Sequence, residues 1–352
     1  MVAATISLPL GVPLVQSYLF LAYPLAILAG HGDVALPWIL ASFVQLYHRP
    51  GGDLKFYTHP WSPADHLRQV SLFTCPWLDV QHLDQRLPGT PLVPFLGHCI
   101  ERGLYVQIDI DYGCLPGDPR RGWLHEILLT GVDRQARVFE ALAYTAGGGF
   151  HSFRLDAETI ETGTNAAAGL ARQRPDSNER PRLLLYRFVP DTAAATPFNV
   201  EGLCDSLWDY LEAANSSTRH RSIAPTIQAL WGIATSTWLE SQILTCNNAA
   251  SANRLAISLR VWWEHKRLMA LCFTYLERQG LLDPDRGAGA EARHIADQAW
   301  KIRLIVLRWR QVPSCGQEQV AAMLREATAR ELDTAGHVVN ALSGGHALRR
   351  AA

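Results

Sequence analysis

Residues 104–158 read LYVQIDIDYGCLPGDPRRGWLHEILLTGVDRQARVFEALAYTAGGGFHSFRLDAE, and this stretch decides the fold. Apolar and polar residues alternate over 104–112, as they do in a half-buried strand. Three more strand-like runs follow at 125–133, 136–144 and 150–158, separated by polar or glycine-rich turns. The spacing predicts an antiparallel meander.

Helical patterns lie on both sides of the meander. Apolar residues predict two N-terminal core helices, at about 17–29 and 36–47. Residues 163–181 have no apolar period and predict a loop, and 182–189 returns to strand character. Five further helices are expected at roughly 200–214, 223–242, 251–280, 290–311 and 316–342. Because strands and helices are segregated, we predict an α+β fold with domains over 1–195 and 196–352.

The charge balance excludes several classes of partner. The 32 basic residues nearly cancel the 33 acidic ones, so no overall field favours a nucleic acid or an anionic membrane. The apolar opening, residues 1–30, lacks the basic start of a signal peptide. Pro9, Pro13 and Pro24 interrupt what would have to be one membrane-spanning helix. We therefore expect no nucleic-acid partner and no membrane segment.

Seven scattered cysteines indicate a reducing compartment. Their number is odd and no C-x-x-C pair occurs, which argues against a disulfide framework and against a structural zinc or other metal site. We therefore expect a cytoplasmic protein without a bound metal.

Chemically reactive side chains are densest around the loop between the first two predicted strands. A histidine at the start of an apolar strand, here His125, can titrate near neutral pH and transfer a proton. The alternative is a histidine with a purely structural role at the strand end. The neighbouring groups are Asp109, Asp111, Tyr112, Cys114, Trp123 and Asp133.

The order of these motifs resembles a known family. HEILLTGVD at 125–133 followed by RVFEALAY resembles two strands of papain-like peptidase relatives, and more specifically of the family that contains the N-terminal domain of butirosin biosynthesis protein H. The preceding DIDY resembles that family's strand ending in Asp and Tyr. RVWWEHKRLMALCFTYL at 260–276 resembles a helix that these relatives carry after the catalytic half.

This resemblance implies both a fold and a reaction. The fold is a papain-like domain, with an antiparallel sheet packed on N-terminal helices and a helical half after it. The reaction is amide formation, in which an acyl group moves from the phosphopantetheine thioester of a carrier protein to a small-molecule amine. The enzyme holds no cofactor beyond that pantetheine arm. Condensation in lincosamide antibiotic biosynthesis is the most specific form of this expectation.

Two positions depart from the family pattern. Ser17 stands where relatives usually have a cysteine, and Ala143 stands where an acid would orient the imidazole of His125. Asp133 or Glu140 could replace that acid. Ser17 could form an ester intermediate, or the amine could attack the thioester directly.

We favour direct attack, with His125 or Asp111 as the base and the backbone amides near Ser17 stabilising the oxyanion. Cys114 is a weaker candidate for a relocated nucleophile. The expected substrate-binding residues are Tyr18, Tyr112, Trp123 and Glu264.

The sequence is also compatible with other functions and with other binding surfaces. A peptidase or thioesterase would pass the acyl group to water, and a non-catalytic scaffold would only bind the carrier protein. Residues 262–267 have the spacing of core aromatics beside a solvated charged stripe, although Glu264 or His265 could instead face a cleft between the halves. The helix at 290–311 is locally basic and could attract an acidic carrier protein.

Overall fold

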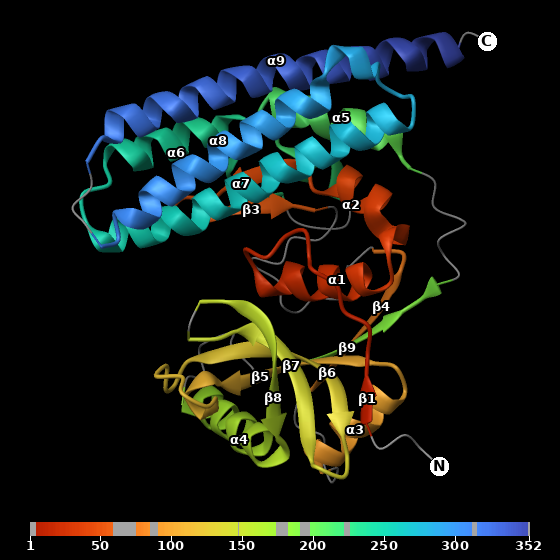
Figure 1. Cartoon of the computed structure of the whole chain (residues 1–352), viewed down its shortest axis with the longest axis vertical. Coiled ribbons are helices and arrows are strands. Elements are labelled where there is room, and N and C mark those ends of the chain that lie inside the picture. The colour runs from red at the N-terminus through yellow and green to blue at the C-terminus, as the bar shows by residue number, and fades with distance from the viewer. Residues whose placement is uncertain are drawn as a thin grey trace. The chain divides into compact units, whose positions relative to one another are not determined.

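The structure is a computed structural model in which 55% of the chain is helical and 20% is strand (Figure 1). It describes residues 5–58, 75–84, 91–146, 148–173, 182–190, 198–221, 226–311 and 315–350. An antiparallel sheet precedes a helical C-terminal half, which confirms the predicted α+β class.

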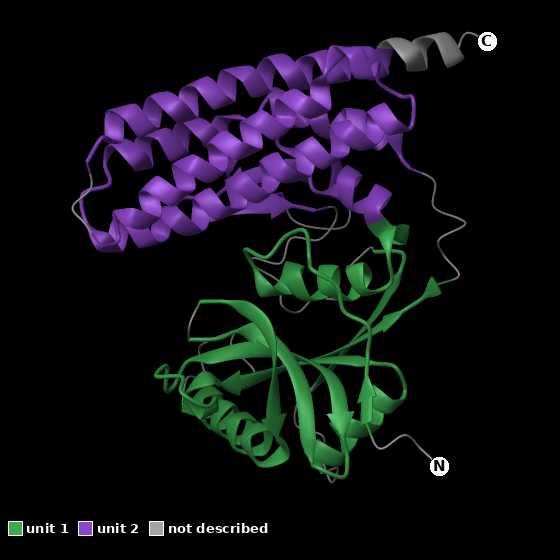
Figure 2. Ribbon diagram, viewed as in Figure 1, with its two compact units in different colours: residues 1–35, 63–196 green, residues 36–62, 197–352 purple. Residues whose placement is uncertain are grey.

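The chain divides into two compact units (Figure 2). Unit 1 contains residues 1–35 and 63–196, and unit 2 contains 36–62 and 197–352. The expected first domain was continuous over 1–195, whereas residues 36–62 belong to the helical unit. This segment is held there by long-range bonds. One example joins the Leu54 amide to Ser258 Oγ at 3.2 Å.

Unit 1 is built on a sheet whose described strands run in the order β4, β9, β5, β6, β7, β8, with β1 paired to β6. All of these pairings are antiparallel. The meander β5–β8 forms as predicted: short turns join β6 to β7 and β7 to β8, and the loop 112–123 joins β5 to β6. The strands are β1 (Thr5–Ser7), β4 (Leu78–Asp84), β5 (Tyr105–Asp111), β6 (Leu124–Asp133), β7 (Val138–Tyr144), β8 (Phe150–Asp156) and β9 (Arg182–Phe188).

One face of this sheet makes an apolar core with α3 (Leu92–Glu101) and α4 (Ala157–Gln173). Residues at every second position, such as Ile108, Ile127 and Ala141, contribute to it. The helix α1 (Leu19–Gly30) is tied to the sheet by the Tyr23 hydroxyl, which donates to the carbonyl of Glu126 at 2.8 Å.

The helix α4 corrects the predicted loop over 163–173, and residues 174–181 of that prediction lie outside the described residues. Asp156 Oδ1 accepts a 2.6 Å bond from the Thr159 amide, so it satisfies one of the free donors of the first turn. Ile160, Thr164 and Ala167 then bury one face of the helix. This face contains too few large apolar side chains to be recognised from periodicity.

Unit 2 consists mainly of helices and includes the small sheet β10–β2–β3. The predicted helix at 36–47 is wrong beyond Ser42, because β2 begins at Gln45 and pairs with β3. The elements are α2 (Leu36–Ser42), β2 (Gln45–His48), β3 (Leu54–Tyr57), α5 (Val200–Leu211), β10 (Leu230–Trp231), α6 (Ala234–Leu244), α7 (Ala249–Arg278), α8 (Ala288–Arg308) and α9 (Gln317–Arg350).

In the part of the chain that the structure describes, no single helix has the length and hydropathy needed to cross a membrane, although α1 and residues 33–42 satisfy that test as a bent pair.

Candidate functional site

The loop after β5 is closed by a carboxylate at its base. Asp111 Oδ1 accepts hydrogen bonds from the amides of Gly113 and Gly122, both at 2.9 Å. A Cβ atom at Gly113 would lie 2.5 Å from Arg121 Cα, so only glycine allows the two sides of the loop to approach this closely. Asp111 therefore holds the loop in shape, and its hydrogen bonds do not support the predicted role as a base.

His125 lies at the start of β6, between two aromatic rings. Its ring centroid is 5.3 Å from that of Tyr112 and 4.6 Å from that of Trp123. Tyr112 is fully buried, whereas Trp123 is 41% exposed. The structure thus brings together three residues that the sequence singled out, and it places them at a partly open end of the sheet.

The carboxylate that orients His125 belongs to the next residue. Glu126 Oε2 lies 2.8 Å from Nδ1 of His125, and the two side chains are 14% and 27% exposed. The Glu126 backbone amide also lies 3.0 Å from Nδ1, and it donates to this nitrogen in the tautomer whose Nε2 carries the proton. In the other tautomer Nδ1 donates to the carboxylate, and Nε2 has a lone pair that can accept a proton from a reactant. This is the division of roles found in nucleophile–histidine–acid triads.

Arg120 packs on the two aromatic rings that flank His125 and is paired with Asp118. Arg120 Nε donates to Asp118 Oδ1 at 2.7 Å, and this pairing lowers the pKa of the Asp118 carboxyl group. The guanidinium lies 4.4 Å from the ring centroid of Trp123 and 4.9 Å from that of Tyr112. Arg120 is therefore held in place by both an ion pair and two aromatic faces.

Two tyrosines place the start of α1 near the same end of the sheet. Tyr23 of α1 donates to the Glu126 carbonyl, and Tyr144 at the end of β7 donates to the Gln16 carbonyl at 2.7 Å. Ser17 is the next residue, two positions before α1 begins, and its Oγ is buried. The predicted neighbourhood of Ser17 and the histidine strand is consistent with these two bonds.

The remaining residues near the start of α1 have structural contacts. Tyr18 is the N-terminal cap residue of α1 and stacks on Phe20, with ring centroids 5.3 Å apart. Burial raises the pKa of both Tyr23 and Tyr112, so these phenols stay protonated and act as hydrogen-bond donors. Burial also raises the pKa of the Cys114 thiol, which disfavours the thiolate that a relocated nucleophile would need.

The two acids predicted to orient His125 lie elsewhere. Asp133 is eight residues farther along β6, which corresponds to roughly 26 Å at about 3.3 Å per residue. Its carboxylate accepts from the Ala136 amide at 2.9 Å. Glu140 is opposite Gly131 and accepts from Ser7 Oγ at 2.6 Å. Both acids secure strand ends, and the structure does not bring either of them to His125.

Sequence reasoning missed Glu126 for a physical reason. Adjacent residues in a strand normally point to opposite faces of the sheet, so the alternation pattern gave no reason to pair residue 126 with residue 125. At the first residues of β6, the glutamate is long enough to reach back to the imidazole. The sequence feature that could have identified this pair is the glutamate that directly follows the histidine.

Glu264, the fourth predicted substrate-binding residue, lies in unit 2. It is buried, and its Oε1 accepts from Arg260 Nε at 3.1 Å. The interpretation of residues 264–266 as a solvated stripe is wrong, because Glu264, His265 and Lys266 are each at most 1% exposed.

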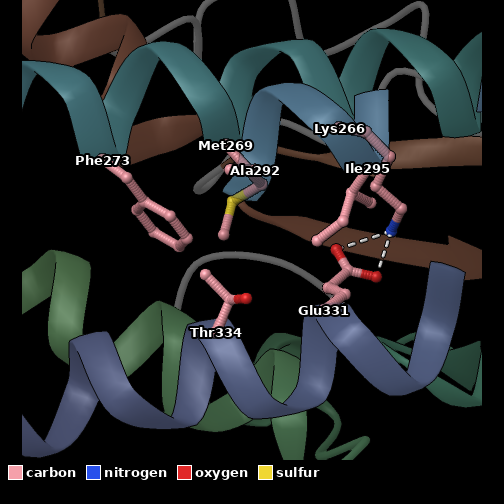
Figure 3. Close-up of a pocket in the computed structure, with 7 residues that line it drawn as sticks. All are labelled: Lys266, Met269, Phe273, Ala292, Ile295, Glu331 and Thr334. Carbon is pink, nitrogen blue, oxygen red and sulfur yellow. Dashed lines mark hydrogen bonds and ion pairs between the residues drawn. The ribbon is translucent and has the colours of Figure 1, made fainter. Parts of the chain in front are cut away.

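A salt bridge compensates for the buried charge of Lys266. Its ammonium donates to Glu331 Oε1 at 2.7 Å and to the Tyr210 hydroxyl at 2.9 Å. The pair lies at one end of a small cavity whose other lining residues are mainly apolar (Figure 3).

Among the described residues, no three histidine, cysteine, aspartate or glutamate side chains are arranged to hold a metal ion. No protein-family model matches the chain, and no curated protein matches it.

Proposed function

We propose that the chain is an amide-forming acyltransferase in which His125 and Glu126 provide the base. The acyl donor is a phosphopantetheine thioester on a carrier protein, and the acceptor is an amine such as an amino sugar. We further propose that unit 1 has a papain-like fold and that the protein works in the cytoplasm on a pathway of antibiotic type, such as lincosamide assembly. Its seven cysteines are free thiols, which fits that compartment.

The observation that carries the proposal is the 2.8 Å contact between Nδ1 of His125 and Glu126 at a partly exposed strand end. An imidazole whose Nδ1 donates to a carboxylate can accept a proton at Nε2 and so act as a general base. Such catalysis contributes about 10²- to 10⁴-fold to rate. The neighbouring Trp123 and Arg120 provide an apolar surface and a positive charge that a donor can contact.

The proposed reaction balances without a further reactant. The amine nitrogen attacks the thioester carbonyl, the C–N bond forms and the C–S bond breaks. The proton leaves the nitrogen for Nε2 of His125, which then returns it to the departing pantetheine thiolate. A thioester is already activated, so orientation and proton removal are sufficient for this step.

Direct transfer fits the chain better than an ester on Ser17. A serine hydroxyl is a poor nucleophile unless a base removes its proton as it attacks. In the direct route His125 removes a proton from the attacking amine instead, and the peptide amides near Ser17 stabilise the oxyanion. The hydrolase alternative requires the same base, but water is then the acceptor.

A turnover assay tests the proposal. Aminoacyl-pantetheine thioesters are incubated with the protein and glucosamine, and the amide is measured by mass spectrometry. We expect amide from the wild type and at least a hundredfold less from His125→Ala, in line with the usual size of general-base effects. His151→Ala, which removes an exposed histidine of β8, is the matched control and should keep full turnover.

The other outcomes are equally specific. Free acid in place of amide would identify a hydrolase, and carrier binding without any product would identify a scaffold. Equal turnover by His125→Ala would remove this histidine from the chemistry. An acyl group trapped on Ser17 would replace direct transfer by the ester route.

A further inference from the structure

Helices α7 and α8 present an outward face that combines arginine with exposed apolar side chains. The two helices pack side by side in unit 2 (Figure 1). We call this surface the arginine–tryptophan face and define it by Trp263 and Arg267 of α7 and Trp300, Arg303 and Leu304 of α8. Trp300 is 36% exposed and Leu304 is 41% exposed. Exposed apolar groups gathered in one place indicate an interaction site more often than scattered ones do.

The guanidinium groups of this face are held against the indole rings. Arg267 lies 4.8 Å from the ring centroid of Trp263, and Arg303 lies 5.0 Å from that of Trp300. The two indoles are 4.6 Å apart. Stacking of this kind restricts the arginines, so less side-chain entropy is lost when they bind a partner.

The charge of the face is mainly positive. Residues 297–310 of the chain contain four basic residues and one acid, Asp297, which lies one turn before Trp300. Between Arg254 and Leu271 the only acid is Glu264, which is buried and paired with Arg260. The whole chain carries a formal charge of −1, so this basic surface is a local feature.

We propose that the arginine–tryptophan face docks an acidic protein whose carboxylates surround a few aliphatic side chains. Planar guanidinium groups in fixed positions match carboxylates in a bidentate geometry. Trp300 and Leu304, one helical turn apart on α8, supply apolar contacts beside them. That this partner is the carrier protein rests on the proposed function, whereas its acidic character rests on the face alone.

Two other polyanions fit less well. Single-stranded nucleic acids need open aromatic faces for base stacking, but arginines cover Trp263 and Trp300 here. An anionic membrane would extend beyond the basic face and meet the acidic groups that balance it elsewhere on the chain. A compact protein meets the basic surface only.

A binding experiment with matched variants tests the proposal. A fluorescently labelled carrier protein bearing its pantetheine arm is titrated with the full chain, and anisotropy gives Kd. We expect the double variant Arg267→Glu/Arg303→Glu to weaken binding at least about tenfold, because it reverses two charges at the centre of the face. Arg102→Glu/Arg172→Glu makes the same change in net charge at exposed sites of unit 1 and should stay within about twofold.

A milder variant separates docking from misfolding. Arg267→Lys/Arg303→Lys keeps the charge but loses the planar fork, so we expect about threefold weaker binding with an unchanged melting temperature. Raising the salt concentration should weaken wild-type binding and affect the charge-reversed variant much less. Undetectable wild-type binding, or equal binding by the reversed variant, would overturn the proposal. Tighter binding of phosphatidylserine vesicles or of a single-stranded oligonucleotide to the same arginines would also overturn it.

The assay also distinguishes this proposal from the proposed function. A small aminoacyl-pantetheine donor needs no protein docking, so the charge-reversed variant should turn it over like the wild type. If the charge-reversed variant shows normal turnover and unchanged carrier binding, the docking proposal is refuted and the acyltransferase proposal stands. If the variant loses carrier binding and the wild type turns over no donor, the docking proposal is supported and the acyltransferase proposal is refuted.

Discussion

The surroundings of His125 in unit 1 and of Lys266 in unit 2 contain the same kinds of side chain but differ in their exposure to solvent. Both combine a histidine, a glutamate, a tyrosine and a cation with tryptophan. The His125 side chain is 27% exposed, whereas His265 and Lys266 are at most 1% exposed. His125 is therefore accessible from solvent, whereas the groups around Lys266 are enclosed in the protein. Exposure thus separates a candidate for chemistry from a structural network.

The largest expected effect concerns the buried pair of unit 2. Lys266→Met removes the cation and leaves the Glu331 carboxylate buried with one fewer partner. We expect a loss of about 3–5 kcal/mol in the free energy of unfolding. Urea unfolding followed by circular dichroism measures it.

The double variant Lys266→Met/Glu331→Leu removes both charges and is the control for this pair. It should recover most of the stability, because a buried ion pair can be replaced by apolar groups at little cost. A single variant as stable as the wild type would show that the network in unit 2 is not structural.

The second prediction concerns the carboxylate missed in the sequence. In Glu126→Gln, the neutral amide can donate to Nδ1 and so hold the imidazole in the tautomer whose Nε2 carries the proton. Turnover should fall about a hundredfold, roughly 2.7 kcal/mol, while unfolding changes little. Steady-state kinetics at neutral pH measure this effect. A large loss of stability with unchanged kcat would place Glu126 with the structural groups.

The third prediction uses the buried histidine. Burial, together with the nearby Lys266 charge, lowers the pKa of His265 well below its usual 6.5. The unfolded chain then binds a proton that the folded chain does not, so stability is retained above about pH 6.5 and decreases as the pH falls below it. The contribution is at most about 1.4 kcal/mol per pH unit.

Chemical unfolding at a series of pH values tests this linkage. His265→Gln cannot titrate and should show a shallower loss below pH 6.5 than the wild type. Parallel curves for the two proteins would contradict the assignment of a neutral buried imidazole.

The smallest effect is expected for Glu140 of β7, which lies beside the far end of β6. Glu140 binds Ser7 and lies away from His125. Glu140→Gln should therefore change turnover by less than about twofold and the free energy of unfolding by about 1 kcal/mol. A strong loss of turnover with normal stability would return Glu140 to the site. The same assay with Asp133→Asn provides a second test of that strand end.

Much of the architecture followed from local pattern. Alternation over 104–158 predicted β5 to β8, and the run at 182–189 predicted β9. The pattern failed where packing decided the structure. Residues 45–48 form a strand because they pair with 54–57, and α4 buries small residues that carry little apolar signal.

For the candidate site, the sequence alone determined the residue types and their order. A histidine at the start of an apolar strand, with tyrosine and tryptophan nearby in the chain, can be recognised without a structure. Only the tertiary structure decided the partners: Glu126 for His125, the loop amides for Asp111, and Glu331 for Lys266. The physical reason is that the direction of a side chain and its exposure to water depend on the packing of residues far apart in the chain. A titratable side chain becomes a base or a structural ion according to those two properties.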